Sequence, residues 1–236
     1  MRFPDGSAAG GPQLSVLEGE RRLPLWIGVT GNIACGKSAV LAMLGEAGAE
    51  TIDADGVYAS LVTAGSPLLA RIAERFGSAV VAGDGQLQRR VLAGIVFADS
   101  AALADLDQIV RPPVVAEILR RAESATAAVV AIDAIKLIES GLADRCDEVW
   151  VVTCRPETQL ARLMARNRLD HESARRRIAA QAPVSAKLDR ADRVIANDGP
   201  LAATREQVER ALRTALEAAA CRTEGGRSVV AAQRKG

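Results

Sequence analysis

The chain has 236 residues, 49% of them hydrophobic, which fits one domain with a substantial apolar core and a lid at most. Thirty Lys and Arg side chains oppose 29 Asp and Glu side chains, for a net charge of +1. This balance gives no reason to expect a nucleic-acid partner. Four cysteines without a CxxC pair and a single histidine, His171, argue against a zinc site.

Both ends of the chain differ from the middle. Residues 1–22 are rich in Gly, Pro and charge and lack the apolar core of a signal peptide. We expect flexible segments at 1–22 and 221–236, around a domain over residues 23–220. No apolar run is long enough to span a membrane. The expected protein is cytoplasmic, binds no membrane, and is a monomer or a weak homo-oligomer.

Short apolar runs alternate with helical patterns along this domain. The runs are Leu25–Thr30, Glu50–Asp53, Ala127–Asp133, Glu148–Thr153 and Val194–Ala196. Runs this short and apolar suit a parallel sheet covered on both faces. The pattern predicts an α/β fold with ligands at the carboxyl ends of about five parallel strands.

A phosphate-binding motif follows the first run. Residues Gly31–Ser38 fit G-x-x-x-x-G-K-[ST] in full, between a predicted strand and a predicted helix over Ser38–Gly45. Its backbone N–H groups and the helix N-terminus favour phosphate, so the motif predicts ATP binding rather than a chance match in a glycine-rich turn. The expected ATP contacts are Gly31, Asn32, Ile33, Ala34, Cys35, Gly36, Lys37, Ser38 and Ala39.

Within this motif, Lys37 is expected on the β- and γ-phosphates and the Ser38 hydroxyl on Mg²⁺. Cys35 lies near a helix N-terminus, where a thiol pKa can fall; the alternatives are a redox role and a tolerated loop residue.

Two carboxylates, Asp53 and Asp55, end the second run, on a strand expected beside the motif's own strand. We predict that Asp55 takes a proton from, or orients, an attacking hydroxyl, while Asp53 points along the sheet edge or caps the following helix. The alternative for both is capping. Asp133 ends the third run and is a candidate Mg²⁺ ligand, with Lys136 near the acceptor; both could instead be surface residues.

Seven arginines lie between residues 155 and 177. Arg162 and Arg166 are one helical turn apart, and residues 167–170 indicate a break between two helices. This pattern predicts a lid whose arginines stabilise the transferring phosphoryl group, with Arg166 as the catalytic candidate. A solvated basic helix face is the alternative. Asn197, after the last run, would contact adenine, brace the motif loop, or serve as a turn residue.

The chain from about Ile27 to Leu212 resembles the dephospho-CoA kinase family. The resemblance depends on motifs in family order: Gly28–Gly31, Ile52–Asp55, Arg75–Gly77, Asp84–Arg90, Ile95–Phe97, Glu139–Leu142, Pro156–Leu160, Arg162-Leu163, Arg177–Gln181, Ala191-Asp192, Ile195 and Asn197–Gly199.

The resemblance implies transfer of the ATP γ-phosphate to the ribose 3′-hydroxyl of dephospho-CoA, the last step of coenzyme A synthesis. It implies a three-layer P-loop NTPase fold with a helical acceptor insertion near residues 55–125 and a lid near 155–182. It also gives Asp55 and Arg166 their roles and places Arg89 in the acceptor insertion.

Departures from the family pattern occur at Asn32, Ala34 and Cys35, where glycines and a serine are usual, at Arg111, where a histidine is usual, and at Ile135-Lys136. A lysine at 136 would suit a substrate phosphate. The alternatives are another P-loop nucleoside or sugar kinase and a regulatory protein that binds ATP without catalysis. The presence of Lys37, Ser38, Asp55 and Arg166 together argues against the latter.

Overall fold

The computed structural model describes residues 24–233, so the expected N-terminal extension over 1–22 lies outside the described residues. The five strands are β1 (Leu25–Gly31), β2 (Glu50–Asp53), β3 (Val129–Asp133), β4 (Glu148–Thr153) and β5 (Arg193–Ala196). Each coincides with a predicted apolar run to within two residues, and no helix in the described range is long and apolar enough to cross a membrane.

Helices fill the segments between the strands. They are α1 (Lys37–Glu46), α2 (Ala54–Leu61), α3 (Pro67–Phe76), η1 (Ser78–Val80), α4 (Arg89–Ala98), α5 (Ser100–Ser124), η2 (Leu142–Arg145), α6 (Pro156–Asn167), α7 (His171–Ala179), α8 (Val184–Leu188) and α9 (Leu201–Gln233).

The five strands form one parallel sheet in the order β2-β3-β1-β4-β5. The expectation that β2 lies beside the motif strand β1 is wrong, because β3 lies between them. The burial of the two strands agrees with this order: four of the five residues of β3 are buried, whereas β2 exposes three of its four residues. A strand with this exposure belongs at a sheet edge, and the apolar β3 belongs inside.

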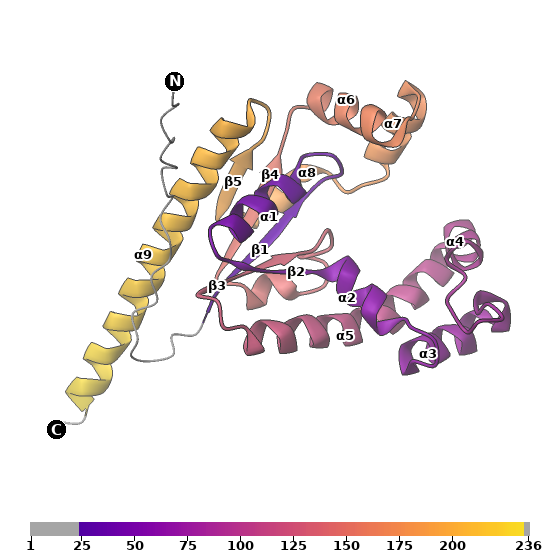
Figure 1. Cartoon of the computed structure of the whole chain (residues 1–236), viewed down its shortest axis with the longest axis horizontal. Helices are drawn as coiled ribbons and strands as arrows, with labels where there is room; N and C mark the ends of the chain where they lie inside the picture. Colours follow the sequence, from indigo (N-terminus) through magenta and orange to yellow (C-terminus); the bar gives the residue numbers. More distant parts are fainter. Residues whose placement is uncertain (1–23, 234–236) are drawn as a thin grey trace, which may run out of the picture.

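Two cores cover the two faces of the sheet and make the fold three-layered. On one face, α1 and α9 pack through Leu44 and Leu212 onto β1 and β4. On the other, α5 packs through Ile118, together with η2. Figure 1 shows α9 along one side of the sheet and α5 along another. Because both faces are covered, only the strand ends remain for polar chemistry.

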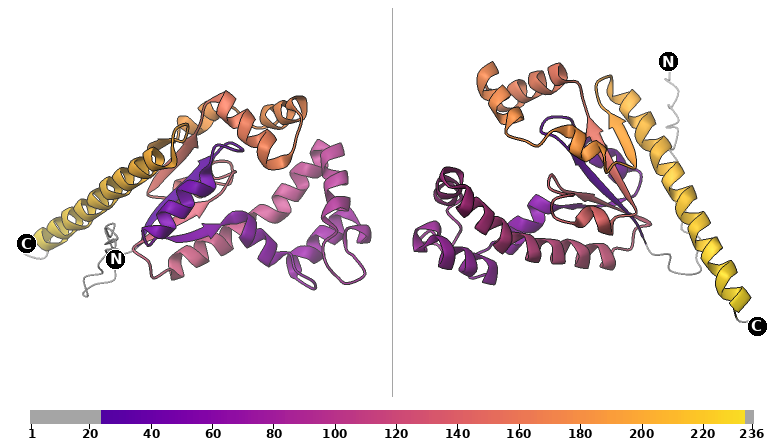
Figure 2. Two further views of the ribbon diagram at one scale, coloured as in Figure 1. Left: turned by 45° about the horizontal axis from the view of Figure 1, so that its top comes forward. Right: turned by 180° about the vertical axis from the view of Figure 1, so that it is seen from behind.

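Helices α2–α5, over residues 54–124, extend beyond the sheet and have a third core of their own, centred on Ile72. We call them the helical insertion. The 25-residue helix α5 contains Pro112 and Pro113 and contributes to both cores, since Ala102 packs in the insertion and Ile118 against the sheet. Helices α6 and α7 contain the arginines expected in a lid, and we call them the lid helices. They and the outer helices of the insertion extend from the same end of the sheet (Figures 1 and 2).

Helix α9 continues to Gln233, through most of the segment expected as a flexible tail from residue 221. Its first half packs on the sheet through Val208 and Leu212. Extending a helix that is already formed needs no new nucleus, and the segment contains good helix formers such as Ala, Arg and Gln. Residue type alone therefore did not mark where this helix ends.

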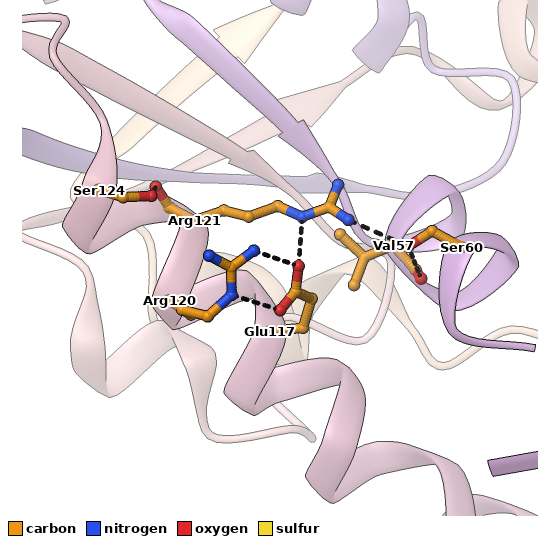
Figure 3. A network of polar contacts seen from close by, with 6 residues as sticks. All are labelled: Val57, Ser60, Glu117, Arg120, Arg121 and Ser124. Atoms are coloured by element: carbon orange, nitrogen blue, oxygen red, sulfur yellow. Dashed lines mark hydrogen bonds and ion pairs between the residues drawn. The ribbon is translucent and has the colours of Figure 1, made fainter. Parts of the chain in front are cut away.

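A polar network joins the helical insertion internally, between α5 and α2 (Figure 3). Glu117 accepts hydrogen bonds from Arg120, at 2.7 and 2.8 Å, and from Arg121, at 2.8 Å. Arg121 also donates to the Ser60 hydroxyl on α2 at 3.0 Å. The hydrogen bonds from Arg120 and then Arg121 lower the pKa of Glu117 to about 2, from an ordinary value of 4.5.

This pKa predicts how Glu117→Gln changes stability with pH. A carboxylate whose pKa is lower in the folded state stabilises it above the unfolded pKa, and this contribution is lost as pH falls toward the folded pKa. We expect Glu117→Gln to lower the free energy of unfolding most above pH 4.5, with the difference from wild type shrinking toward pH 2. Urea unfolding at several pH values measures it. Exposed Glu123 on the same helix is the control, and a pH-independent difference would contradict the assignment.

Candidate active site

The motif loop connects β1 to α1 and is packed too tightly for side chains at its glycines. A Cβ on Gly36 would lie 1.8 Å from Asn197 Nδ2, and one on Gly31 would lie 2.4 Å from the backbone oxygen of Val152. Gly36 also has a φ of 92°, a region that favours glycine. Both defining glycines are therefore required by space, and Gly36 is required by its backbone angle as well.

Asn197 braces the loop from the end of β5. Its Nδ2 donates to the Cys35 carbonyl at 2.9 Å, and its Oδ1 accepts from the Thr204 hydroxyl at 2.9 Å. The side chain is only 3% exposed. Of the sequence alternatives, bracing the motif loop is the one that the structure shows.

Residues on and after helices α6 and α7 form hydrogen bonds with the motif loop at Asn32 and Ile33. Gln159 on α6 donates to the Ile33 carbonyl at 2.9 Å, and Gln181, after α7, accepts from the Ile33 N–H at 2.8 Å. Asn32 donates its side-chain amide to the carbonyl of Ala182 at 3.3 Å. The shape of the loop and the position of the lid helices are therefore linked by three hydrogen bonds.

Lys37 lies at the centre of a cluster of charges and forms an ion pair with Asp133 at the end of β3. Burial lowers its pKa, and the negative charges of Asp55 and then Asp53 oppose that shift. Lys187 lowers it further. The motif lysine, the acid at the end of β3 and the acids after β2 thus share one electrostatic environment, as the strand-end argument predicts.

Asp53 and Asp55 have different local roles. Asp53 is the N-cap of α2, and its two carboxylate oxygens accept from the N–H groups of Asp55 and Gly56 at 3.0 Å each. Asp55 lies exposed in the first turn of the same helix. The structure therefore assigns the capping role to Asp53.

Sequence reasoning missed Lys187 on α8, which is 5% exposed. Its ammonium donates to the Ile135 carbonyl at 3.1 Å and lies 4.0 Å from a carboxylate oxygen of Glu139. Thr30 donates its hydroxyl to the same carbonyl at 3.2 Å. A buried lysine needs such partners, and its position in a helix of only five residues gave no sequence signal.

The two lid arginines on one helical face have different surroundings. Arg166 is exposed, and its Nε donates to Asn167 at 3.0 Å. Arg162 has a buried guanidinium nitrogen, Nη1, with no hydrogen-bond partner in the described part of the chain. That nitrogen is 3.6 Å from where a Cβ on Gly36 would lie. A buried, unpaired cationic donor beside a phosphate-binding loop fits an anion such as a nucleotide phosphate.

The acceptor candidates lie on the helical insertion and the loop after β3. Lys136 pairs with Asp107 on α5 at 3.0 Å, and Arg111 pairs with the same carboxylate and donates to the Glu139 carbonyl at 2.9 Å. Asp107 and Arg111 help line a surface pocket of about 440 Å³. The guanidinium carbon of Arg89 lies 5.6 Å from the ring centre of Tyr58.

Four features together define a P-loop nucleotide-dependent kinase. They are a parallel sheet whose first strand leads into a phosphate-binding loop, a lysine in that loop, an acid at the end of the neighbouring strand, and arginines on the helices over the loop. Residues 25–203 match the dephospho-CoA kinase family model. The chain belongs to the dephospho-CoA kinase family.

Individual relatives agree with this assignment. A dephospho-CoA kinase of Symbiobacterium thermophilum is 48% identical over 203 residues, covering 85% of this chain and 83% of the relative. One of Syntrophotalea carbinolica is 45% identical, covering 78% and 89%. The crystal structure of TT1252 from Thermus thermophilus has a TM-score of 0.72 at 32% identity and covers 82% and 98%. The structure of a dephospho-CoA kinase from Campylobacter jejuni has a TM-score of 0.54 at 23% identity. It covers 82% of this chain and 98% of its own, and it supports the fold.

Ala34 has a φ of 61°, an unfavourable region for a residue with a Cβ. We expect Ala34→Gly to raise the free energy of unfolding by about 0.5–1 kcal/mol, because the relieved strain exceeds the extra freedom of glycine in the unfolded chain. Exposed Ala42 within α1 is the matched control, where glycine should cost about 1 kcal/mol. Chemical unfolding measures both, and equal losses at the two positions would refute the strain.

Proposed function

We propose that this chain transfers the γ-phosphate of ATP to the ribose 3′-hydroxyl of dephospho-CoA, with Mg²⁺ bound at the site. The observation that carries the proposal is the charge cluster in which Lys37 forms an ion pair with Asp133, while burial lowers the pKa of Lys37 and the charge of Asp55 opposes that shift. It joins the donor loop to the acceptor side in a chain whose family and relatives are named for this activity.

The donor half consists of the loop Gly31–Ala39. Its backbone N–H groups and the N-terminal end of α1 surround the phosphates, and Lys37 contacts the β- and γ-phosphates. Asn197 acts on ATP indirectly, because it holds the carbonyl of Cys35 and so the curvature of the loop.

Ser38 and Asp133 are the proposed Mg²⁺ ligands. Ser38 is exposed in the first turn of α1, next in sequence to Lys37, which pairs with Asp133. Hydroxyl and carboxylate oxygens are the donors that Mg²⁺ prefers, so these residues fit the ion. When bound, the ion neutralises charge on the β- and γ-phosphate oxygens.

Asp55 is the proposed base or orienting group for the 3′-hydroxyl. It lies at the carboxyl end of β2, on the first turn of α2, from which the helical insertion begins. The backbone N–H groups already occupy the oxygens of Asp53, so of the two acids Asp55 has the oxygens available for a substrate hydroxyl.

The cationic groups of Lys136, Arg111 and Arg89 are proposed to bind the acceptor. Asp107 pairs with Lys136 and Arg111 together, so one negative charge opposes two positive charges. The diphosphate of dephospho-CoA supplies the missing negative charge at the nearby pocket. Arg89, over the Tyr58 ring, lies at the start of α4.

The reaction is tested by coupled ADP release with ATP·Mg²⁺ and a panel of acceptors. Dephospho-CoA should be turned over well above adenosine, shikimate or gluconate, and Asp55→Asn should lower kcat by about 10²-fold or more. Asp53→Asn is the matched control, because Asn caps a helix as well as Asp. Absence of turnover with dephospho-CoA would refute the function, whereas a near-normal kcat for Asp55→Asn would leave Asp55 a positioning role.

The lid contact is tested by comparing Arg162 with Arg166. We expect Arg162→Ala to lower kcat/KM for ATP by about 10- to 100-fold, the value of one hydrogen bond to a charged group in a water-poor site. Arg166→Ala, at the exposed position, should change it by less than about 3-fold. Thermal unfolding of both variants controls for folding. The opposite ranking would return the catalytic role to Arg166, as the sequence predicts.

A further inference from the structure

Two cysteines that are 119 residues apart in the sequence meet at the motif loop. Cys35 belongs to the loop and is 4% exposed. Cys154 directly follows β4 and is half-buried. Its thiol donates a hydrogen bond to the Cys35 sulfur, with the two sulfur atoms 3.0 Å apart.

The spacing of these sulfurs is close to that of a disulfide. An S–S bond is about 2.05 Å long, so the sulfurs would have to approach by roughly 1 Å. The other two cysteines have different surroundings: Cys146 donates to the Leu142 carbonyl at 3.3 Å, and Cys221 is exposed on α9. Cys35 and Cys154 are therefore the pair that the fold prepares for a cross-link.

In the resting protein this pair is a hydrogen-bonded dithiol. Burial, followed by the hydrogen bond to Cys35, raises the pKa of Cys154 to about 12. The nearby guanidinium of Arg162 acts in the opposite direction. Cys154 is therefore protonated at neutral pH, which keeps it the donor of the pair and leaves the first attack on a peroxide to the Cys35 sulfur.

We propose that Cys35 and Cys154 are a modification site at which a peroxide forms an intramolecular disulfide, and that this disulfide weakens ATP binding. The Cys35 sulfur attacks one oxygen of hydrogen peroxide to form a sulfenic acid, and the other oxygen leaves as water. The second sulfur displaces the sulfenic oxygen as a second water and forms the S–S bond. Two thiols and one hydrogen peroxide thus give one disulfide and two waters.

The disulfide acts on ATP through the loop backbone. The Cys35 carbonyl accepts a hydrogen bond from Asn197, and the backbone N–H of Cys35 donates to the Asn32 carbonyl at 3.2 Å. Drawing the sulfur toward β4 pulls this backbone away from its braced position. The loss of one loop hydrogen bond to a charged phosphate is enough to weaken binding by about 10-fold or more, so a loss of at least about 10-fold in ATP affinity is expected.

The two equilibria are reciprocal. If the disulfide weakens ATP binding, bound ATP must oppose formation of the disulfide by the same factor. Saturating ATP·Mg²⁺ should therefore lower the fraction of cross-linked protein at equilibrium in a thiol–disulfide redox buffer.

The test uses the full chain and measures ATP binding by calorimetry, so its result does not depend on which acceptor the enzyme phosphorylates. After hydrogen peroxide, wild type should yield a peptide linking Cys35 to Cys154 and bind ATP at least about 10-fold more weakly. Dithiothreitol should restore the affinity. Cys146→Ser, the matched control, should respond like wild type, whereas Cys154→Ser should keep its affinity.

Three results would overturn the proposal. The first is peroxide treatment that yields no Cys35–Cys154 peptide in wild type. The second is a cross-linked wild type with unchanged ATP affinity. The third is a reversible loss of affinity in Cys154→Ser as large as in wild type. The first two readouts use wild type alone, so they decide the matter even if the serine variant folds poorly.

Discussion

The contact of Gly36 with Asn197 is the constraint on which the site depends. The amide of Asn197 occupies the volume where a side chain on Gly36 would lie, and it holds the adjacent Cys35 carbonyl. A loop that surrounds anions must keep its N–H groups turned inward without an anion to organise it. Here β5 and α9, through Asn197 and Thr204, supply that organisation from the far end of the chain. Assembly of the last strand and helix is therefore a condition for a working donor site.

The second constraint is electrostatic. A buried lysine is costly unless it is paired. Burial lowers the pKa of Lys37, and the charge of the nearby Lys187 lowers it further. Asp133 pairs with Lys37, and the Ile135 carbonyl accepts from Lys187, only two residues further along the same strand end. The end of β3 and the residues after it thus provide polar partners for both cations. The same segment continues into Lys136, which pairs with Asp107 on the helical insertion.

The sequence predicted the strands and the loop well, because both have local signatures. It could not order the strands, because an apolar run does not indicate which other strand it pairs with. In the structure the mostly exposed β2 lies at the edge of the sheet, beside β3. Helical spacing placed Arg162 and Arg166 on one face of α6. It could not show that Arg162, and not Arg166, has a buried guanidinium nitrogen beside the motif loop. Lys187 and the Cys35–Cys154 pair depend on contacts across many residues, for which no local pattern exists.

The long helix α5 has a mechanical consequence. Its two halves belong to different cores, and Pro112 and Pro113 lie between Ala102 and Ile118. Proline removes a backbone hydrogen bond from the helix, so bending there costs less than elsewhere along α5. A rotation of the helical insertion concentrated at this pair would preserve most contacts within each core and change those of Tyr58, Leu61 and Val110, which pack against both. Arg111 and Asp107 lie next to this pivot, so the angle of the insertion and the spacing of the acceptor cations would change together.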